Sequence, residues 1–335
     1  MERGTDVARA AAILARGGLV AFPTETVYGL GADATSEAAA LRIFAAKGRP
    51  HAHPLIVHLA EGARLDDWAV DVPEAAHRLA RAAWPGPLTL ILRKGPRVAA
   101  ATTGGGDTIG LRVPAHPVAQ ALLGRFGGGI AAPSANRFGA VSPTTPDHVA
   151  ADLGDAVDYL LEGGACEVGV ESTIVDLSRG RAVLLRPGGL PRAQIEPITG
   201  PLEEADAAAP AAPGTLASHY APRAELIAVA LDEVPAAVAR VRIARIAARA
   251  AGAEPAKIAV LAPAAAFAAW PGLDATAYRL ADDVAGMARG LYAALRDLDA
   301  AGVDVVIAAL PPAAGLGEAV GDRLRRAAGP RRNPS

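Results

Sequence analysis

The sequence predicts an α/β fold, in which a twisted, open, mixed sheet is followed by a linker and a smaller Rossmann-like domain. Its 335 residues exceed the length of one ordinary domain. Short β-branched segments alternate with helical segments through residues 1–190. An Ala- and Pro-rich stretch then separates this alternation from a second one. We therefore expect a first domain over 1–200, a linker over 201–222, a second domain over 223–330 and a disordered tail over 331–335.

The first domain is expected to hold short strands bounded by Gly or Pro, and helices between them. The expected strands are 19–24, 54–59, 88–93, 108–113, 129–134, 172–177 and 182–186. The expected helices are 6–16, 36–47, 73–84, 117–126 and 146–153. Thr35 or Ser36 can cap the second helix, because either hydroxyl can accept a hydrogen bond from a free backbone N–H. Gly48 can end that helix in the left-handed conformation.

The second domain is expected to be a small βαβ unit with parallel strands. Its expected strands are 225–230, 257–262 and 303–309, and its expected helices are 233–251, 282–300 and 318–328. Gly315–Gly321 follows a strand and opens a helix, like a dinucleotide-binding loop. Its spacing departs from G-x-G-x-x-G, and the chain ends before an acidic ribose-binding strand could follow, so we expect a structural glycine turn.

Composition narrows the functional classes. The chain is 51% hydrophobic and 4% aromatic, so its core must consist mainly of Ala, Val, Leu and Ile. Its formal net charge of −2 argues against strong direct nucleic-acid binding, which normally requires a basic excess. Cys166 is the only cysteine, so neither an internal disulfide nor a Cys-rich zinc site can form. Residues 1–18 lack the apolar core of a signal peptide, and the apolar runs are too short to span a bilayer. We expect a soluble, cytoplasmic protein.

Two early clusters carry polar side chains beside predicted strands. Residues 23–31 offer hydroxyls and glycines for a ligand pocket, although the same residues are also typical of a Thr-rich turn with structural glycines. Lys47 and Arg49 flank a glycine at a helix end and can converge on an anion, but the helix dipole alone also favours a lysine there. Three histidines follow, His51, His53 and His58. They lack nearby Cys or acidic ligands, so we favour polar or surface histidines over a metal site.

Later clusters offer an anion site and a polar strand end. The triple glycine at 104–106 can form a backbone nest, or simply a flexible loop, and Arg112 on the next strand can clamp a carboxylate. Ser134 and Asn136 offer hydrogen bonds but have no obvious base nearby, so a nucleophilic serine is not expected. Arg186 could hold a phosphate or pair with Glu171, and the sequence leaves both possibilities open.

In combination these clusters are specific, and the chain resembles the Sua5/YrdC family. The similarity extends over residues 10–200 in matching order and spacing. Its blocks are PTETVYGLG (23–31), KGRP with PLIVH (47–58), WPGPLTLIL (84–92), TIGLRVP (108–114), APSAN (132–136), ESTIVD (171–176) and LRPG (185–188). SHYAP (218–222) and the second domain resemble the longer, Sua5-type members.

The resemblance implies a YrdC-like sheet with a large concave pocket for ATP and L-threonine. By position, L-threonine would be held by Thr26, His58, Arg112, Ala132 and Ser172. Lys47 and Arg49 would be the catalytic and phosphate-binding cations. The remaining nucleotide-binding positions are His53, Thr108, Ser134, Asn136, Ser142, Arg186 and Tyr220. His53 replaces the asparagine usual in the family, which puts that contact in doubt. Tyr220, with His219, would cover the nucleotide as part of a lid, unless SHYAP only docks the linker.

The implied reaction joins L-threonine, bicarbonate (or CO2) and ATP into L-threonylcarbamoyladenylate and pyrophosphate, with Mg2+ on the ATP phosphates. It would be the first step of N6-threonylcarbamoyladenosine formation at position 37 of tRNAs reading codons that begin with A. Downstream tRNA threonylcarbamoyl-transferase proteins would receive the product. Two rivals are a double-stranded-RNA-binding module, which the slightly acidic net charge disfavours, and a carbamoyl-transferring maturation enzyme, whose zinc fingers one cysteine cannot build.

Overall fold

The computed structural model describes residues 1–215, 219–250, 254 and 256–330, so the predicted tail 331–335 lies outside the described residues. The chain forms two compact units. The first contains Met1–Phe138 and Ser142–Thr215, and the second contains Gly139–Val141 and the described residues after Thr215. The division therefore falls inside the predicted linker. Among the described residues, no helix has the length and apolar character needed to cross a membrane.

The first unit contains a mixed sheet of twelve strands among the described residues, as the α/β prediction requires. Strand β5 (Ala69–Val70) pairs with β6 (Leu88–Lys94) and stands outside the continuous order of the other strands. Along the sheet the order is β1 (Glu2–Gly4), β9 (Tyr159–Leu161), β2 (Val20–Phe22), β3 (Gly29–Asp33), β8 (Ile130–Ala131), β4 (Ile56–His58), β7 (Thr108–Arg112), β6 (Leu88–Lys94), β10 (Thr173–Asp176), β11 (Val183–Arg186) and β12 (Glu203–Glu204).

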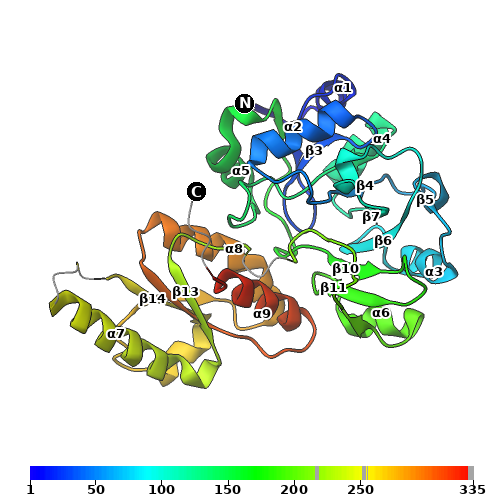
Figure 1. The fold of residues 1–335 in the computed structure, drawn as a ribbon. Helices are drawn as coiled ribbons and strands as arrows, with labels where there is room; N and C mark the ends of the chain where they lie inside the picture. Colours follow the sequence, from blue (N-terminus) through cyan, green and yellow to red (C-terminus); the bar gives the residue numbers. More distant parts are fainter. Residues whose placement is uncertain (216–218, 251–253, 255, 331–335) are drawn as a thin grey trace. The chain divides into compact units, whose positions relative to one another are not determined.

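Six α-helices are described in this unit (Figure 1), and capping residues fix both ends of α2. Ser36 accepts a hydrogen bond from the Ala39 N–H at the start of α2, and Gly48 ends that helix at φ 63°. This capped end holds Lys47 at a defined position. The helices are α1 (Val7–Ala15), α2 (Glu37–Lys47), α3 (Glu74–Ala83), α4 (Pro117–Phe126), α5 (Pro146–Leu153) and α6 (Arg192–Thr199).

The central strands of this sheet have two different faces. Val57, Leu90 and Leu111 belong to the main hydrophobic core. Ile56, Ile91 and Ile174 belong to a separate small cluster, which Ala212 from the segment before Thr215 covers. Because side chains alternate along a strand, His58 shares the face of Ile56, and Thr89 shares the face of Ile91. The second face therefore combines apolar and polar positions.

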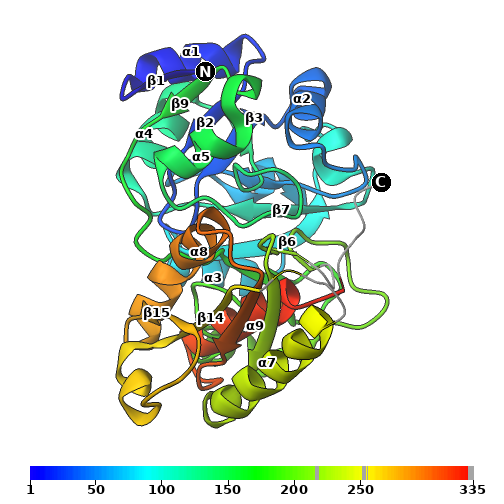
Figure 2. The same cartoon turned by 90° about the vertical axis from the view of Figure 1, so that its left-hand side faces the viewer.

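The second unit is a parallel sheet with helices on both faces, which confirms the predicted Rossmann-like architecture (Figures 1 and 2). Helix α7 lies on one face, and α8 and α9 pack together on the other. The strand order is β13 (Glu225–Val229), β16 (Val305–Ala309), β14 (Ile258–Pro263) and β15 (Thr276–Leu280). The helices are α7 (Val234–Ala250), α8 (Val284–Ala300) and α9 (Leu316–Ala327).

The glycines that open α9 have structural reasons. Gly315 lies at φ 59°, which favours a residue without a Cβ. A Cβ on Gly317 would lie 1.8 Å from the Pro312 carbonyl oxygen. Both observations fit the expected structural turn.

Candidate active site

Neighbouring strands bring His58 and Arg112 together. Both residues end their strands, and the parallel register of β4 and β7 pairs them directly. Continuing the antiparallel register of β6 and β7 by one residue places Thr89 beside Arg112. Thr89 is in turn paired with Ile174 of β10. His58, Arg112 and Thr89, which come from three different parts of the sequence, thus form one polar row across neighbouring strands.

Arg112 lies against a buried carboxylate that sequence reasoning did not select. A guanidinium nitrogen of Arg112 is 2.7 Å from Glu25 Oε1, and the two side chains are 4% and 6% exposed. The contact is poorly aligned for hydrogen bonding. Both Glu25 oxygens, and Nε and one Nη of Arg112, therefore have no hydrogen-bond partner among the described residues. Buried charges are normally hydrogen-bonded, so these atoms are candidates for contact with a ligand.

His58 is neutral at physiological pH. Burial, reinforced by the positive charge of Arg112, lowers its pKa to about 3. The Phe22 ring and the imidazole pack nearly perpendicular to each other, with ring centroids 5.8 Å apart. Its Nδ1 has no hydrogen-bond partner within the described part of the chain. A neutral imidazole can both donate and accept one hydrogen bond, which suits recognition of an uncharged polar group.

Arg186 contacts Ser172, whose hydroxyl lies next to Thr89 of the polar row. Its guanidinium donates to the Ser172 carbonyl (2.8 Å), to Ser172 Oγ (3.2 Å) and to the Pro213 carbonyl (2.9 Å). Ser172 Oγ also lies 2.8 Å from Thr89 Oγ1. Nearby, Ser142 Oγ donates to Glu171 Oε1 at 2.6 Å. Glu171, which the sequence offered as a possible partner of Arg186, thus accepts a hydrogen bond from Ser142.

Lys47 and Arg49 form a buried cationic group near the turn after β8. Lys47 Nζ donates to the Ser134 carbonyl (2.6 Å) and to the Asn136 carbonyl. Arg49 donates to the Pro54 carbonyl at 3.0 Å, and its guanidinium lies 5.7 Å from the centre of the Phe138 ring. Burial, together with the nearby Arg49 charge, holds the pKa of Lys47 well below its usual value.

The other predicted residues of the first unit lie in ordered positions. Thr26 is fully buried, and its hydroxyl is 2.8 Å from Thr24 Oγ1. Ala132 follows β8, and its N–H donates to the Ile56 carbonyl at 2.8 Å. Thr108 begins β7 and is half-buried. His53 is half-buried beside the Phe138 ring, with centroids 5.3 Å apart.

Tyr220 lies in the second unit. It is 1% exposed and packs against Tyr292, with ring centroids 5.8 Å apart. The Arg323 guanidinium lies 5.0 Å from its ring centre. His219 contacts the same ring edge-on at 4.1 Å. Ser218 of the SHYAP motif lies outside the described residues.

The three histidines considered for a metal site point to different neighbours. His51 packs on Phe44 at 5.2 Å and His53 on Phe138, whereas His58 belongs to the Arg112 group. Within the described ranges, no three His, Cys, Asp or Glu side chains are grouped to hold a metal ion.

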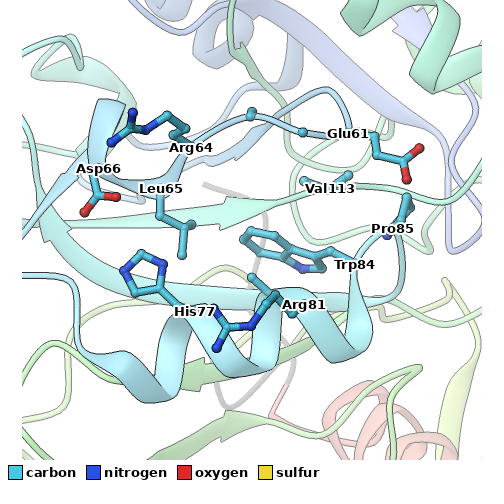
Figure 3. A pocket seen from close by; sticks show the side chains of 12 residues that line it. Glu61, Arg64, Leu65, Asp66, His77, Arg81, Trp84, Pro85 and Val113 are labelled. Carbon is cyan, nitrogen blue, oxygen red and sulfur yellow. The ribbon is translucent and has the colours of Figure 1, made fainter.

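A separate pocket of about 290 Å³ lies between α3 and the 61–66 segment (Figure 3). Trp84, Leu65 and His77 line it, together with charged side chains at its edge. Trp84 is held by a hydrogen bond from Nε1 to the Leu88 carbonyl at 2.7 Å. Val113, next to Arg112, also lines the pocket, but the predicted site residues do not.

Known proteins share this arrangement over nearly the whole chain. The family model described as telomere recombination (Sua5/YciO/YrdC) matches residues 12–188, and the threonylcarbamoyl-AMP synthase C-terminal domain matches 190–329. The chain belongs to the Sua5/YciO/YrdC family. The expected resemblance is thereby confirmed, including the longer, Sua5-type organisation.

Individual members support this assignment. The chain is 44% identical to threonylcarbamoyl-AMP synthase of Pyrococcus abyssi, over 96% of this chain and 93% of that protein. It is 39% identical to the Bacillus subtilis protein of the same name, over 97% and 93%. The crystal structure of P. abyssi Sua5 complexed with L-threonine superposes with a TM-score of 0.87 and 40% identity, covering 98% of this chain and 96% of that one. The two-domain α/β fold is therefore that of a Sua5 protein.

Proposed function

We propose that this protein is an L-threonylcarbamoyladenylate synthase, which joins L-threonine, bicarbonate and ATP and releases pyrophosphate. Full-length similarity to synthases of two organisms supports the activity. The observation that carries the assignment to particular residues is the buried group of Glu25, His58 and Arg112, whose polar atoms lack hydrogen-bond partners in the described residues.

The threonine subsite follows from charge. A free amino acid is a zwitterion, and Glu25 and Arg112 place opposite buried charges side by side. The threonine carboxylate would pair with Arg112, and its ammonium would face Glu25. His58 and Ser172, with Thr26, would hydrogen-bond the remaining polar groups, while Ala132 would line the subsite. These bonds would supply the partners that the buried atoms lack, so threonine would bind tightly only when all of its polar groups are present.

The nucleotide subsite follows from the cationic group. Lys47 and Arg49 would hold the triphosphate, with Mg2+ entering as part of the MgATP substrate. An anion beside a buried amine favours its protonated form, so the phosphates would reverse the depressed pKa of Lys47. We assign the remaining nucleotide contacts to the positions matched in the family: His53, Thr108, Ser134, Asn136, Ser142 and Arg186.

The chemistry requires positioning rather than a protein nucleophile. Bicarbonate takes up a proton and loses water to give CO2, and the neutral threonine amine adds to CO2 and releases a proton as the carbamate forms. The carbamate oxygen then attacks the α-phosphorus while the bond to the leaving pyrophosphate breaks. Glu25 can receive the proton that the ammonium loses, because the proposed binding mode places its carboxylate opposite the ammonium. Lys47 and Arg49 would neutralise charge as it shifts to pyrophosphate.

Two finer roles complete the proposal. We assign Tyr220, which packs against Tyr292 and Arg323, to a lid over the nucleotide. The product would pass to downstream threonylcarbamoyl-transferase proteins that modify position 37 of tRNAs reading codons beginning with A.

The test measures pyrophosphate release by the purified chain with MgATP and bicarbonate, with and without L-threonine, while the product mass is recorded. Release that depends on both threonine and bicarbonate, with the mass of the adduct, is the expected result. A folded protein that binds ATP but releases no pyrophosphate under any of these conditions would overturn the proposal. Titration with double-stranded RNA would then test the rival binding-module function.

A further inference from the structure

On the second unit, α7 has an exposed apolar stripe. Ile243 and Ile246 are each 68% exposed, although full burial of such a side chain contributes about 1.5 to 3 kcal/mol. Ala236, Ala239 and Ala247 are also exposed and follow at helical spacing, so all five residues lie on one side of the helix. We call these five residues the α7 stripe.

A groove runs beside the α7 stripe. It has a volume of about 590 Å³ and lies between α7 and the 269–274 segment. Val238 and Ile243 line it from the helix, and Trp270 and Leu273 line it from the segment. Ile243 belongs to both features, so the groove and the stripe form one continuous apolar surface.

The far wall of the groove is tied to α7. Arg242 donates to the Asp274 carbonyl through Nε (2.9 Å) and Nη2 (2.6 Å), and to Asp274 Oδ1 at 2.9 Å. Trp270 packs edge-on against Phe267, with ring centroids 5.5 Å apart. The groove is therefore formed before a partner arrives, which lowers the entropic cost of binding.

The surface around the stripe is cationic. The sequence of α7 contains arginines at positions 240, 242, 245 and 249, and no Asp or Glu. Arg242 pairs with Asp274, and Arg245 pairs with Glu225 at 3.1 Å. Arg240 is exposed and forms no ion pair with the described residues, so its positive charge is not compensated.

We propose that the α7 stripe and its groove bind an acidic amphipathic helix of a partner protein. Such a helix inserts apolar side chains at i, i+3, i+4 and i+7 into a groove, and acidic residues at its edge would face Arg240. A second copy of the chain would bring together two α7 helices that carry arginines and no acidic residue, which is electrostatically unfavourable. A flat membrane surface cannot enter a groove, and a nucleic acid would leave Ile243 and Ile246 without apolar partners.

The test uses the full-length chain and a fluorescein-labelled helical peptide of about four turns, with Leu at the four anchor positions and Glu on both flanks. Saturable fluorescence anisotropy is expected. The double substitution Ile243→Ser/Ile246→Ser should weaken binding at least about tenfold. Arg240→Glu should weaken the Glu-flanked peptide but strengthen a Lys-flanked version. Val70→Ser and Arg78→Glu, which change exposed residues of the first unit, should change neither affinity.

Several results would overturn the proposal. One is the absence of saturable binding. Another is equal binding of a scrambled peptide, or unchanged binding of the Glu-flanked peptide by Ile243→Ser/Ile246→Ser or by Arg240→Glu. A dimer in sedimentation experiments that the double substitution abolishes would assign the surface to a second copy. Binding of phosphatidylserine vesicles or tRNA that the same substitution abolishes, without peptide binding, would assign it to those ligands. Pyrophosphate release should remain unchanged in every variant, because no substituted residue belongs to the proposed site.

Discussion

Replacing Arg112 by Met separates the structural role of this residue from its proposed ligand role. Glu25 and Arg112 form a buried pair at 2.7 Å. Arg112→Met leaves the Glu25 carboxylate buried without a counter-charge, and removal of one partner from such a pair typically destabilises a protein by about 3 to 5 kcal/mol. Replacing both residues by apolar ones of similar volume is often neutral. Glu25→Met/Arg112→Met should therefore return most of the lost stability.

Threonine binding should respond differently. A charge-assisted hydrogen bond to the threonine carboxylate is worth about 1.5 to 3 kcal/mol, which corresponds to a loss of affinity of about 10- to 100-fold. Both the single and the double substitution should lose this affinity, because each lacks the guanidinium. The double substitution thus restores folding without restoring ligand binding.

Urea unfolding and titration calorimetry measure the two quantities. Unfolding is followed by Trp68 and Trp84 in a Trp270→Phe background, so that the fluorescence reports the first unit. Calorimetry measures threonine binding to the full chain. The reasoning is refuted if Arg112→Met binds threonine as well as the parent, or if the double variant recovers threonine affinity.

Three further predictions concern single side chains. Lys47→Ala should lower the rate of pyrophosphate release at least about tenfold, and near-normal turnover would remove Lys47 from the mechanism. His58 has a folded-state pKa of about 3, whereas the pKa of an unfolded histidine is about 6.5. Between these two values only the unfolded chain binds the proton, so lowering the pH from 7.5 to 5 should reduce the free energy of unfolding of the first unit by about 2 kcal/mol. The variant His58→Gln should lack this drop. Burial raises the pKa of Cys166 to about 12, so iodoacetamide should modify the native thiol far more slowly than the urea-unfolded one, and equal rates in mass spectrometry would contradict its buried position.

Most helices and strands were predicted from short sequence patterns, because residues within a few positions of each other determine where these elements begin and end. The helix that ends at Lys47 has Ser36 at its N-terminal cap and a left-handed Gly48 after it. Helices α4 and α5 begin at Pro117 and Pro146, where the expected helices 117–126 and 146–153 also begin, and proline is favoured at the first helical position. These features depend on residues a few positions apart, and the sequence displays them directly.

Elements shaped by close packing were missed. Strand β3 reads Gly-Leu-Gly-Ala-Asp, which has little strand propensity. In the structure, a Cβ on Gly31 would lie 2.7 Å from the Ile130 side chain and 2.8 Å from Phe22. The neighbouring strands thus require glycine there, and this requirement becomes visible only after folding.

The sequence by itself determined the α/β class, the second Rossmann-like domain and, through its motif blocks, the family. Only the tertiary structure decided that Glu25 faces Arg112, that Ser142 bonds Glu171, and that Lys47 binds the carbonyls of the turn after β8. The physical reason is sequence separation. Strand pairing joins residues that lie far apart in the chain, and the choice among competing charged partners depends on burial and angles that a linear pattern does not contain.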